Sequence, residues 1–377
     1  VWMVAVLVLP AAVFGALAAV TSQLGASRSQ AVRWAAAALG LAYAVRVLAT
    51  ASEATWLTWT TPLGWVDQVA PLTEQRPLPL VIGVAATAAL AVLAVVLSSR
   101  RDCGAGLLGQ RPAGPSRVRT LGGPTGLAAR LVRPSAVGWV VGLAALGAMF
   151  GLVAPTASEA LAGAQLDLGV GGVDGIPQAA STQDRAAAFL GGGFLFVTLL
   201  VSLAGAAQAA AAREAEASGR LETLLAAPVS RLHWLISRVA VTTVLLLVAG
   251  VSAGLAAWLG ALVAGERLAV DDLVAAGVNT VPASLVVLGV GILALGARPR
   301  WTGAIAYGYV AGAFLLELVG GLFDVAQPLL PLSVFHHVPL VPAADADPWG
   351  WAGLVAVAAV AVALGALALH RRDVTAE

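Results

Sequence analysis

The stretch VAVTTVLLLVAGVSAGLAAWLGALV, residues 239–263, contains no charged side chain. It is long enough to cross a lipid bilayer, because a spanning α-helix needs about 20 consecutive apolar residues. Eight further apolar runs have similar length, so the sequence predicts an all-α polytopic membrane protein with about nine transmembrane helices. These runs cover residues 2–21, 31–50, 79–99, 135–154, 186–211, 278–297, 302–320 and 350–370.

The composition supports a membrane protein and excludes some functions. Hydrophobic residues make up 59% of the chain and charged residues 11%, whereas soluble domains contain about 25% charged residues. Membrane β-barrels show short alternating strands, but the apolar runs here are continuous, which favours helices. The net charge of +1 gives no reason to expect a nucleic-acid partner. All 21 basic residues are arginine, so the chain lacks the lysine of a phosphate-binding P-loop and cannot hydrolyse ATP by that route.

The distribution of arginine predicts the orientation of the spans. Seven arginines and one acid, Asp102, lie between residues 100 and 134, and cytoplasmic loops are enriched in basic residues. Alternation from this linker places residues 213–238, 298–301 and 371–377 on the cytoplasmic side, and most acids on the outer side. We therefore expect a multi-pass protein of the plasma membrane with a cytoplasmic C-terminus.

The chain also contains an internal repeat. Arg100-Arg101-Asp102 follows one apolar run and Arg371-Arg372-Asp373 follows the last, at an offset of 371 − 100 = 271. This offset predicts three parts: residues 1–105 are the last three spans of a first repeat, 106–134 form a basic linker with an elbow helix, and 135–377 form a complete six-span repeat. On this interpretation about three spans precede Val1.

The polar stretch between residues 213 and 238 has the pattern of an amphipathic helix. Leu221, Leu224 and Leu225 are spaced to share one helical face, and acidic and arginine side chains surround it. Pro228 is expected to end this helix, and Ser230 to cap the next one. The pattern fits an interfacial helix on lipid headgroups and a docking element for a cytoplasmic partner equally well.

Residues 216–231, EASGRLETLLAAPVSR, resemble the intracellular loop of type-2 ABC exporter permeases, in particular the actinobacterial polyketide-antibiotic exporter branch. Residues 60–66, 101–107 and 124–130 resemble that branch's outer loop, linker and elbow helix. The resemblance implies a coupling helix that docks on a cytoplasmic ABC ATPase subunit, present in two copies. ATP and Mg would be bound by that partner, and no cofactor by this chain. The docking residues it implies are Glu214, Glu216, Gly219, Arg220, Leu221, Glu222, Leu224, Leu225, Pro228, Ser230 and Arg231.

Two features depart from the pattern of this family. A complete member would be a fused pair of six-helix halves, and the first half's opening helices and coupling loop are not in this chain. In addition, Phe335-His336-His337 stands where the first repeat has Val66-Asp67-Gln68.

Two tryptophan- and proline-rich segments, 54–71 and 324–342, lie on the predicted outer side. Tryptophan is enriched at membrane interfaces, so these segments fit simple interfacial caps. The family resemblance implies instead short re-entrant helices that close the outer end of a translocation path. The residues assigned to them are Pro62, Leu63, Trp65, Pro331, Leu332 and Phe335.

Charges within spans are costly and suggest function. Arg46 and Glu317 lie at equivalent repeat positions, since 317 − 46 = 271, and we hypothesise that they pair; the alternative is that each extends to the headgroups. His336 and His337 have no evident third ligand, so no metal site is predicted. The small-residue pairs Gly147/Gly151, Gly138/Gly142 and Gly308/Gly312 predict close helix packing.

Three functions remain open from the residues. The first is the permease subunit of an ATP-driven exporter of hydrophobic compounds, such as polyketide antibiotics or drugs, with the protein embedded in the lipid bilayer. The second is a secondary, ion-coupled transporter, which needs intramembrane ionisable groups; the two candidates, Arg46 and Glu317, lie away from the centre of their spans. The third is a membrane-embedded enzyme or structural protein, for which no polar constellation is evident.

Overall fold

The computed structural model describes residues 2–25, 28–51, 55–69, 76–100, 123–163, 181–219, 230–320 and 324–372. Helices account for nearly all of these residues, and no strand occurs among them, which confirms the all-α fold. The chain forms two compact units, Val1–Ser116 and Arg117–Glu377, which are described separately below.

The first unit contains three long helices and two short ones. The long helices are α1 (Trp2–Leu24), α2 (Arg28–Ala51) and α5 (Leu78–Ser99). The short helices α3 (Thr55–Thr58) and α4 (Pro62–Val69) lie between α2 and α5 in the chain. Helix α1 packs against α2, α4 and α5. At Gly83 of α5 a Cβ atom would lie 2.3 Å from the Leu9 side chain, so the absence of a side chain lets α1 approach closely.

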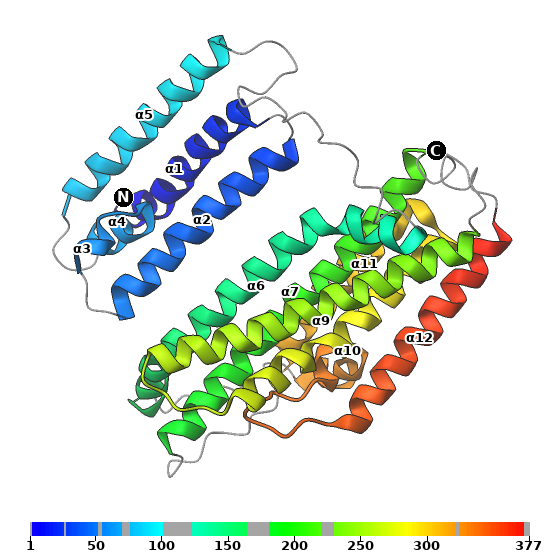
Figure 1. The fold of residues 1–377 in the computed structure, drawn as a ribbon. Helices are drawn as coiled ribbons and strands as arrows, with labels where there is room; N and C mark the ends of the chain where they lie inside the picture. The colour runs from blue at the N-terminus through cyan, green and yellow to red at the C-terminus, as the bar shows by residue number, and fades with distance from the viewer. Residues whose placement is uncertain are drawn as a thin grey trace. The chain divides into compact units, whose positions relative to one another are not determined.

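The second unit is a bundle of six long helices (Figure 1). They are α6 (Pro124–Gly163), α7 (Thr182–Ala217), α9 (Arg231–Val263), α10 (Val270–Ala297), α11 (Thr302–Gly320) and α12 (Pro348–Arg371). Three 3₁₀ segments complete it: η2 (Pro299–Trp301), η3 (Asp324–Leu332) and η4 (Phe335–His337). Helix α10 packs against α7, α9, α11 and α12 and is the most buried of the six, so it forms the centre of the bundle.

Small residues bring α6 and α9 into backbone contact. A Cβ atom at Gly147 would lie 2.1 Å from the carbonyl oxygen of Ala253, and one at Gly151 would lie 2.0 Å from that of Ala257. This confirms the close packing predicted from the Gly147/Gly151 pair. Among the residues that the structure describes, added Cβ atoms at Gly138, Gly142, Gly308 and Gly312 meet nothing within 4 Å, so the predicted close packing is not found at these glycines within their unit.

Seven helices in the described part of the chain are long and apolar enough to cross a membrane, so the protein is polytopic. They are α5, α6, α7, α9, α10, α11 with its preceding η2, and α12. Helix α1 contributes a shorter apolar segment, Val8–Leu24, and the predicted total of nine spans stays a prediction. Helix α6 begins at Pro124, so the predicted elbow helix and the following span are one continuous helix.

The helix bounds follow the repeat seen in the sequence. Moving α5 along the chain by 271 residues gives 349–370, which lies within α12. The same offset carries α1 into α10, and α2 onto η2 and α11. In the first unit α2 is followed by the short helices α3 and α4 and then by the last long helix, α5. In the second unit α11 is followed by η3 and η4 and then by the last long helix, α12. The boundaries predicted for the linker stay a prediction.

Candidate functional site

The predicted docking loop lies between the ends of α7 and α9. Gly219 has a φ of +70°, a left-handed conformation that suits glycine directly after a helix, and it ends α7. Ser230 begins α9, because its Oγ accepts a hydrogen bond of 3.2 Å from the backbone N–H of His233. The predicted helix cap at Ser230 is thereby confirmed. Other predicted docking residues, namely Arg220, Leu221, Glu222, Leu224, Leu225 and Pro228, lie outside the described residues.

A buried carboxylate joins the two flanks of this loop to the end of α12. Glu216 is 1% exposed, and its Oε1 accepts a hydrogen bond of 2.5 Å from Nη2 of Arg372. Nη1 of Arg213 lies 3.9 Å from Oε2 of the same carboxylate. On the other flank, Nη1 of Arg231 donates a 2.7 Å hydrogen bond to the carbonyl oxygen of Arg372. We call Arg213, Glu216, Arg231 and Arg372 the loop anchor.

The loop anchor mechanically connects three long helices. A buried charge is tolerated only where it is paired, so the Glu216 carboxylate fixes the ends of α7 and α12 relative to each other. Arg231 adds the first turn of α9 to the same cluster. A force applied to the loop would therefore reach α7, α9 and α12 together. The sequence pointed to Glu216 and Arg231 but did not predict a role for Arg372.

At the predicted outer end, η3 and η4 are fixed by one buried aromatic ring and one hydroxyl. Phe335 is 1% exposed and meets Phe314 of α11 edge to face, with ring centroids 5.8 Å apart. Ser333 Oγ donates a hydrogen bond of 3.1 Å to the carbonyl oxygen of Ala313, also in α11. Leu332 is 68% exposed, so of the three residues assigned to this segment Phe335 anchors it and Leu332 does not.

A buried amide attaches the chain after η4 to two more helices. Asn279 of α10 donates a hydrogen bond of 2.6 Å to the carbonyl oxygen of Pro339, and its own oxygen accepts one of 2.6 Å from the indole of Trp351 in α12. The outer segment of the second repeat, which we define as residues 324–344, is therefore tied to α10, α11 and α12.

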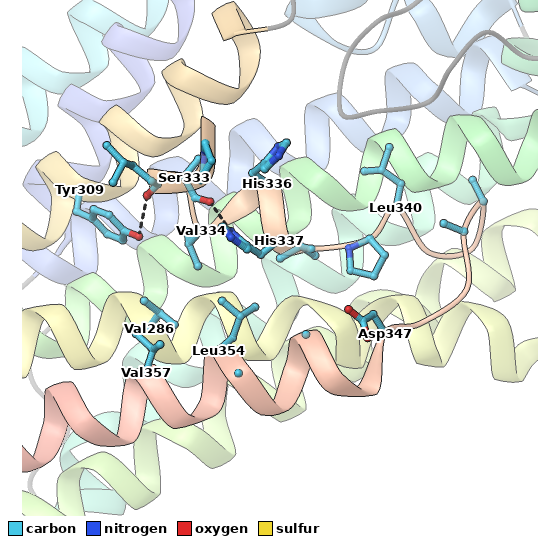
Figure 2. Close-up of a pocket in the computed structure, with 18 residues that line it drawn as sticks. Val286, Tyr309, Ser333, Val334, His336, His337, Leu340, Asp347, Leu354 and Val357 are labelled. Carbon is cyan, nitrogen blue, oxygen red and sulfur yellow. Dashed lines mark hydrogen bonds between the residues drawn. The ribbon is translucent and has the colours of Figure 1, made fainter. Parts of the chain in front are cut away.

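A hollow of about 990 Å³ lies between this outer segment and α12 (Figure 2). Apolar side chains, including Val286, Leu354 and Val357, form much of its wall. Tyr309 donates a hydrogen bond of 3.4 Å to the carbonyl oxygen of Leu332, and Nδ1 of His337 lies 3.0 Å from the carbonyl oxygen of Ser333.

The first unit has a hollow of about 590 Å³ in the matching place. It is lined by parts of α1, α2 and α5 and by the start of α4. Ala38 and Ala86 line it, and the repeat offset of 271 carries these positions to Tyr309 and Val357 in the larger hollow. Each repeat thus has a hollow beneath its short outer helices. Of the residues assigned to the first outer segment, Pro62 and Trp65 line this hollow, and Leu63 is half-buried in α4.

Both charges predicted within spans have a partner in their own unit. Arg46 of α2 makes two hydrogen bonds of 2.7 Å to the carboxylate of Asp67 in α4. Oε1 of Glu317 in α11 lies 3.7 Å from Nδ1 of His336 in η4. Residues Asp67 and His336 were missed as partners from the sequence. The hypothesised contact of Arg46 with Glu317 would join the two units and stays a prediction.

The second unit coincides with a known protein family. Residues 121–370 match the family described as multidrug efflux system permease Rv1217c, C-terminal domain. The chain belongs to this family. It is 36% identical over 368 residues to the multidrug efflux system permease protein Rv1217c of Mycobacterium tuberculosis (strain ATCC 25618 / H37Rv). That match covers 96% of this chain, and the chain spans 65% of the length of the relative.

Membership of the multidrug efflux permease family agrees with the helical architecture. The matched region contains all six long helices of the second unit, together with the loop anchor residues Arg213, Glu216 and Arg231 and the outer segment. A bundle of apolar helices is one of the two architectures that can span a membrane.

Proposed function

We propose that the chain is a membrane permease subunit of an ATP-driven, ABC-type efflux system of the plasma membrane, which exports hydrophobic compounds such as polyketide antibiotics or drugs. The observation that carries this proposal is the loop anchor. Its buried Glu216 and half-buried Arg372 tie a loop of coupling-helix sequence to the ends of α7, α9 and α12. Family membership supports the efflux role.

The proposed partner is a cytoplasmic ABC ATPase subunit, in two copies, which binds ATP and Mg. The chain contains no lysine and so lacks the phosphate-binding residue of a P-loop, which leaves hydrolysis to the partner. The ATPase would dock on residues 214–231. Its movement would enter the permease where the loop anchor joins three helices, and this requires the loop and the C-terminus to be cytoplasmic.

Helix α12 is the route by which this movement would reach the outer segment. Its 24 residues give it a length of about 36 Å, at about 1.5 Å per residue. Arg372 follows its last turn and contacts Glu216, whereas Trp351 in its first turn contacts Asn279. Asn279 in turn holds the backbone at Pro339. One rigid helix therefore connects the loop anchor to the outer segment.

A secondary transporter is the alternative function, and one observation favours it. Glu317 is 7% exposed, and no hydrogen-bond partner is found for its Oε2 among the described residues. A buried carboxyl of this kind could carry a proton in ion-coupled transport. Loss of transport on addition of an uncoupler, with ATP still present, would support this alternative.

Co-purification tests the proposed partner directly. The protein is tagged at its C-terminus, extracted from its own host in mild detergent and examined for a bound P-loop ATPase. The variant Glu222→Arg reverses a charge in the docking loop and is expected to lose the ATPase. Glu159→Arg makes the same substitution at an exposed position of α6 and should retain it. Absence of an ATPase from the wild-type sample would contradict the proposal, and its retention by Glu222→Arg would place docking elsewhere.

A further inference from the structure

The two ion pairs at the predicted outer end occupy equivalent positions in the two repeats. Arg46 and Glu317 correspond through the offset of 271. Asp67 comes five residues after Pro62 of the first Pro-Leu pair, and His336 comes five residues after Pro331 of the second. In each repeat the pair therefore joins the long helix before the outer segment, α2 or α11, to a short helix of that segment, α4 or η4.

The charges of the two pairs are reversed. In the first repeat the long helix carries the cation, Arg46, and the short helix carries the anion, Asp67. In the second repeat the long helix carries the anion, Glu317, and the short helix carries the imidazole of His336, which is cationic when protonated. The two repeats therefore have a contact between a carboxylate and a basic side chain at the same place, although the residue types differ.

The surroundings of Glu317 show why its partner matters. Its side chain is 6% exposed, whereas that of His336 is 44% exposed. A buried carboxylate needs a nearby cation or donor, so moving η4 away from α11 would leave Glu317 buried and unpaired. Ser333 contacts Ala313 one turn before Glu317, and Phe335 packs on Phe314 beside it. The pair thus reinforces a packed contact between η4 and α11.

We propose that Arg46–Asp67 and Glu317–His336 are latches, which hold the outer segment of each repeat against the long helix that precedes it, α2 or α11, and must open for cargo to leave. The inference rests on the proposed efflux function. These four residues position the outer segments and need not contact the cargo. The hollow in each repeat lies beneath the latched segment, so an opened latch widens the space available to a hydrophobic molecule.

Thiol labelling tests the latches without any need for transport. In a Cys103→Ser background, single reporters are placed at buried positions of the two latched segments, Val338→Cys in the second and Val69→Cys in the first. The purified protein in nanodiscs is treated with a water-soluble maleimide. Closed segments should label slowly. Glu317→Gln should raise the labelling rate at residue 338, and Arg46→Gln that at residue 69, each by about two- to fivefold, the effect of losing one partly exposed ion pair.

Charge exchange separates a latch from general loosening of the fold. Glu317→His combined with His336→Glu should label as slowly as the wild type. His336→Arg alone should also label slowly, because it keeps a cation facing the carboxylate. The control Asp271→Asn removes an exposed acid outside the latches and should leave both rates unchanged. Equal labelling in the wild type and Glu317→Gln, or an exchanged pair no slower than the single variants, would overturn the latch.

Addition of ATP to the complete transporter distinguishes failure of the latch from failure of the proposed function. If both proposals hold, ATP increases labelling at residue 338 in the wild type. If labelling responds to the latch variants but not to ATP, the latches hold their segments but ATP does not open them, which overturns the ATP-driven cycle. If ATP-dependent transport continues unchanged in Glu317→Gln and Arg46→Gln, the latches have no part in transport.

Discussion

Arg372 and Glu216 form a buried contact of 2.5 Å although 156 residues separate them in the chain. The carboxylate of Glu216 is almost completely shielded from solvent, and Arg372 contributes both a side-chain donor to it and a backbone acceptor for Arg231. This single residue after α12 therefore holds both ends of the loop between α7 and α9.

Replacement of Arg372 is expected to destabilise the second unit. Arg372→Gln removes the nearest cation from the buried Glu216 carboxylate. Breaking a fully buried pair costs about 3–5 kcal/mol, and we expect a smaller loss here, because Arg372 is partly exposed and Arg213 remains 3.9 Å from the carboxylate. The measurement is the midpoint of thermal unfolding in detergent. Arg371→Gln is the matched control, because Arg371 is the exposed neighbour and should change the midpoint little. Equal effects of the two variants would show that the Glu216 contact contributes nothing to stability.

Gly151 should not tolerate a larger side chain. A Cβ atom there would lie 2.0 Å from the carbonyl oxygen of Ala257, so Gly151→Leu must push α6 and α9 apart. Overpacking of this kind costs about 1–3 kcal/mol or more, and we expect a lower yield of folded protein by size-exclusion chromatography. Gly142→Leu, on the same helix, meets open space and should be tolerated. Similar yields from both variants would contradict the close contact of α6 with α9.

The indole of Trp351 should contribute to holding the outer segment. Trp351→Phe removes the donor to Asn279 and leaves a buried amide oxygen without that partner, at a cost of about 1–3 kcal/mol. The unfolding midpoint should fall, and labelling of Val338→Cys should become faster. Trp349→Phe tests the same substitution two residues earlier, where the side chain is 87% exposed, and no change is expected. Unchanged stability in Trp351→Phe would remove Asn279 from the route between α12 and the outer segment.

The cap at Ser230 should matter for stability and for docking. Ser230→Ala removes the acceptor for the N–H of His233 and is expected to cost about 1 kcal/mol, while Ser230→Asp keeps an acceptor and should cost less. Because fraying of α9 would displace the docking loop, the Ala variant should also recover less ATPase in the co-purification. Equal recovery with Ala and Asp would separate the cap from docking.

The helices and one cap could be predicted from local sequence, because hydropathy and capping depend on neighbouring residues. Helix α10 and the Ser230 cap are examples. The apolar run predicted as a span begins at residue 239, because Arg238 interrupts it, whereas the helix itself begins at Arg231, directly after the predicted cap. The sequence predicted a boundary at Pro134 between the elbow helix and the first span of the second repeat. In the structure Pro134 interrupts only the apolar pattern, and α6 continues through this residue.

The contacts at both ends of the bundle could not be predicted in this way. Arg372 reaches Glu216 only because α7 and α12 come together in three dimensions. The sequence did align Asp67 with His336, but as a departure from the family pattern. The role that Asp67 and His336 share becomes visible only in the structure, where Asp67 contacts Arg46 of α2 and His336 lies beside Glu317 of α11.

The reversed polarity of the two latches has a consequence for how a duplicated protein assembles correctly. If the short helix of one repeat reached α2 or α11 of the other, Arg46 would face the imidazole of His336 instead of a carboxylate, and Glu317 would face the carboxylate of Asp67. Neither mistaken pairing places a carboxylate beside a basic side chain, and one brings two carboxylates together, whereas each native pairing joins a carboxylate to a basic side chain. Repulsion in the wrong partner is an effective source of specificity. The arrangement of charges therefore disfavours an exchange of the two outer segments.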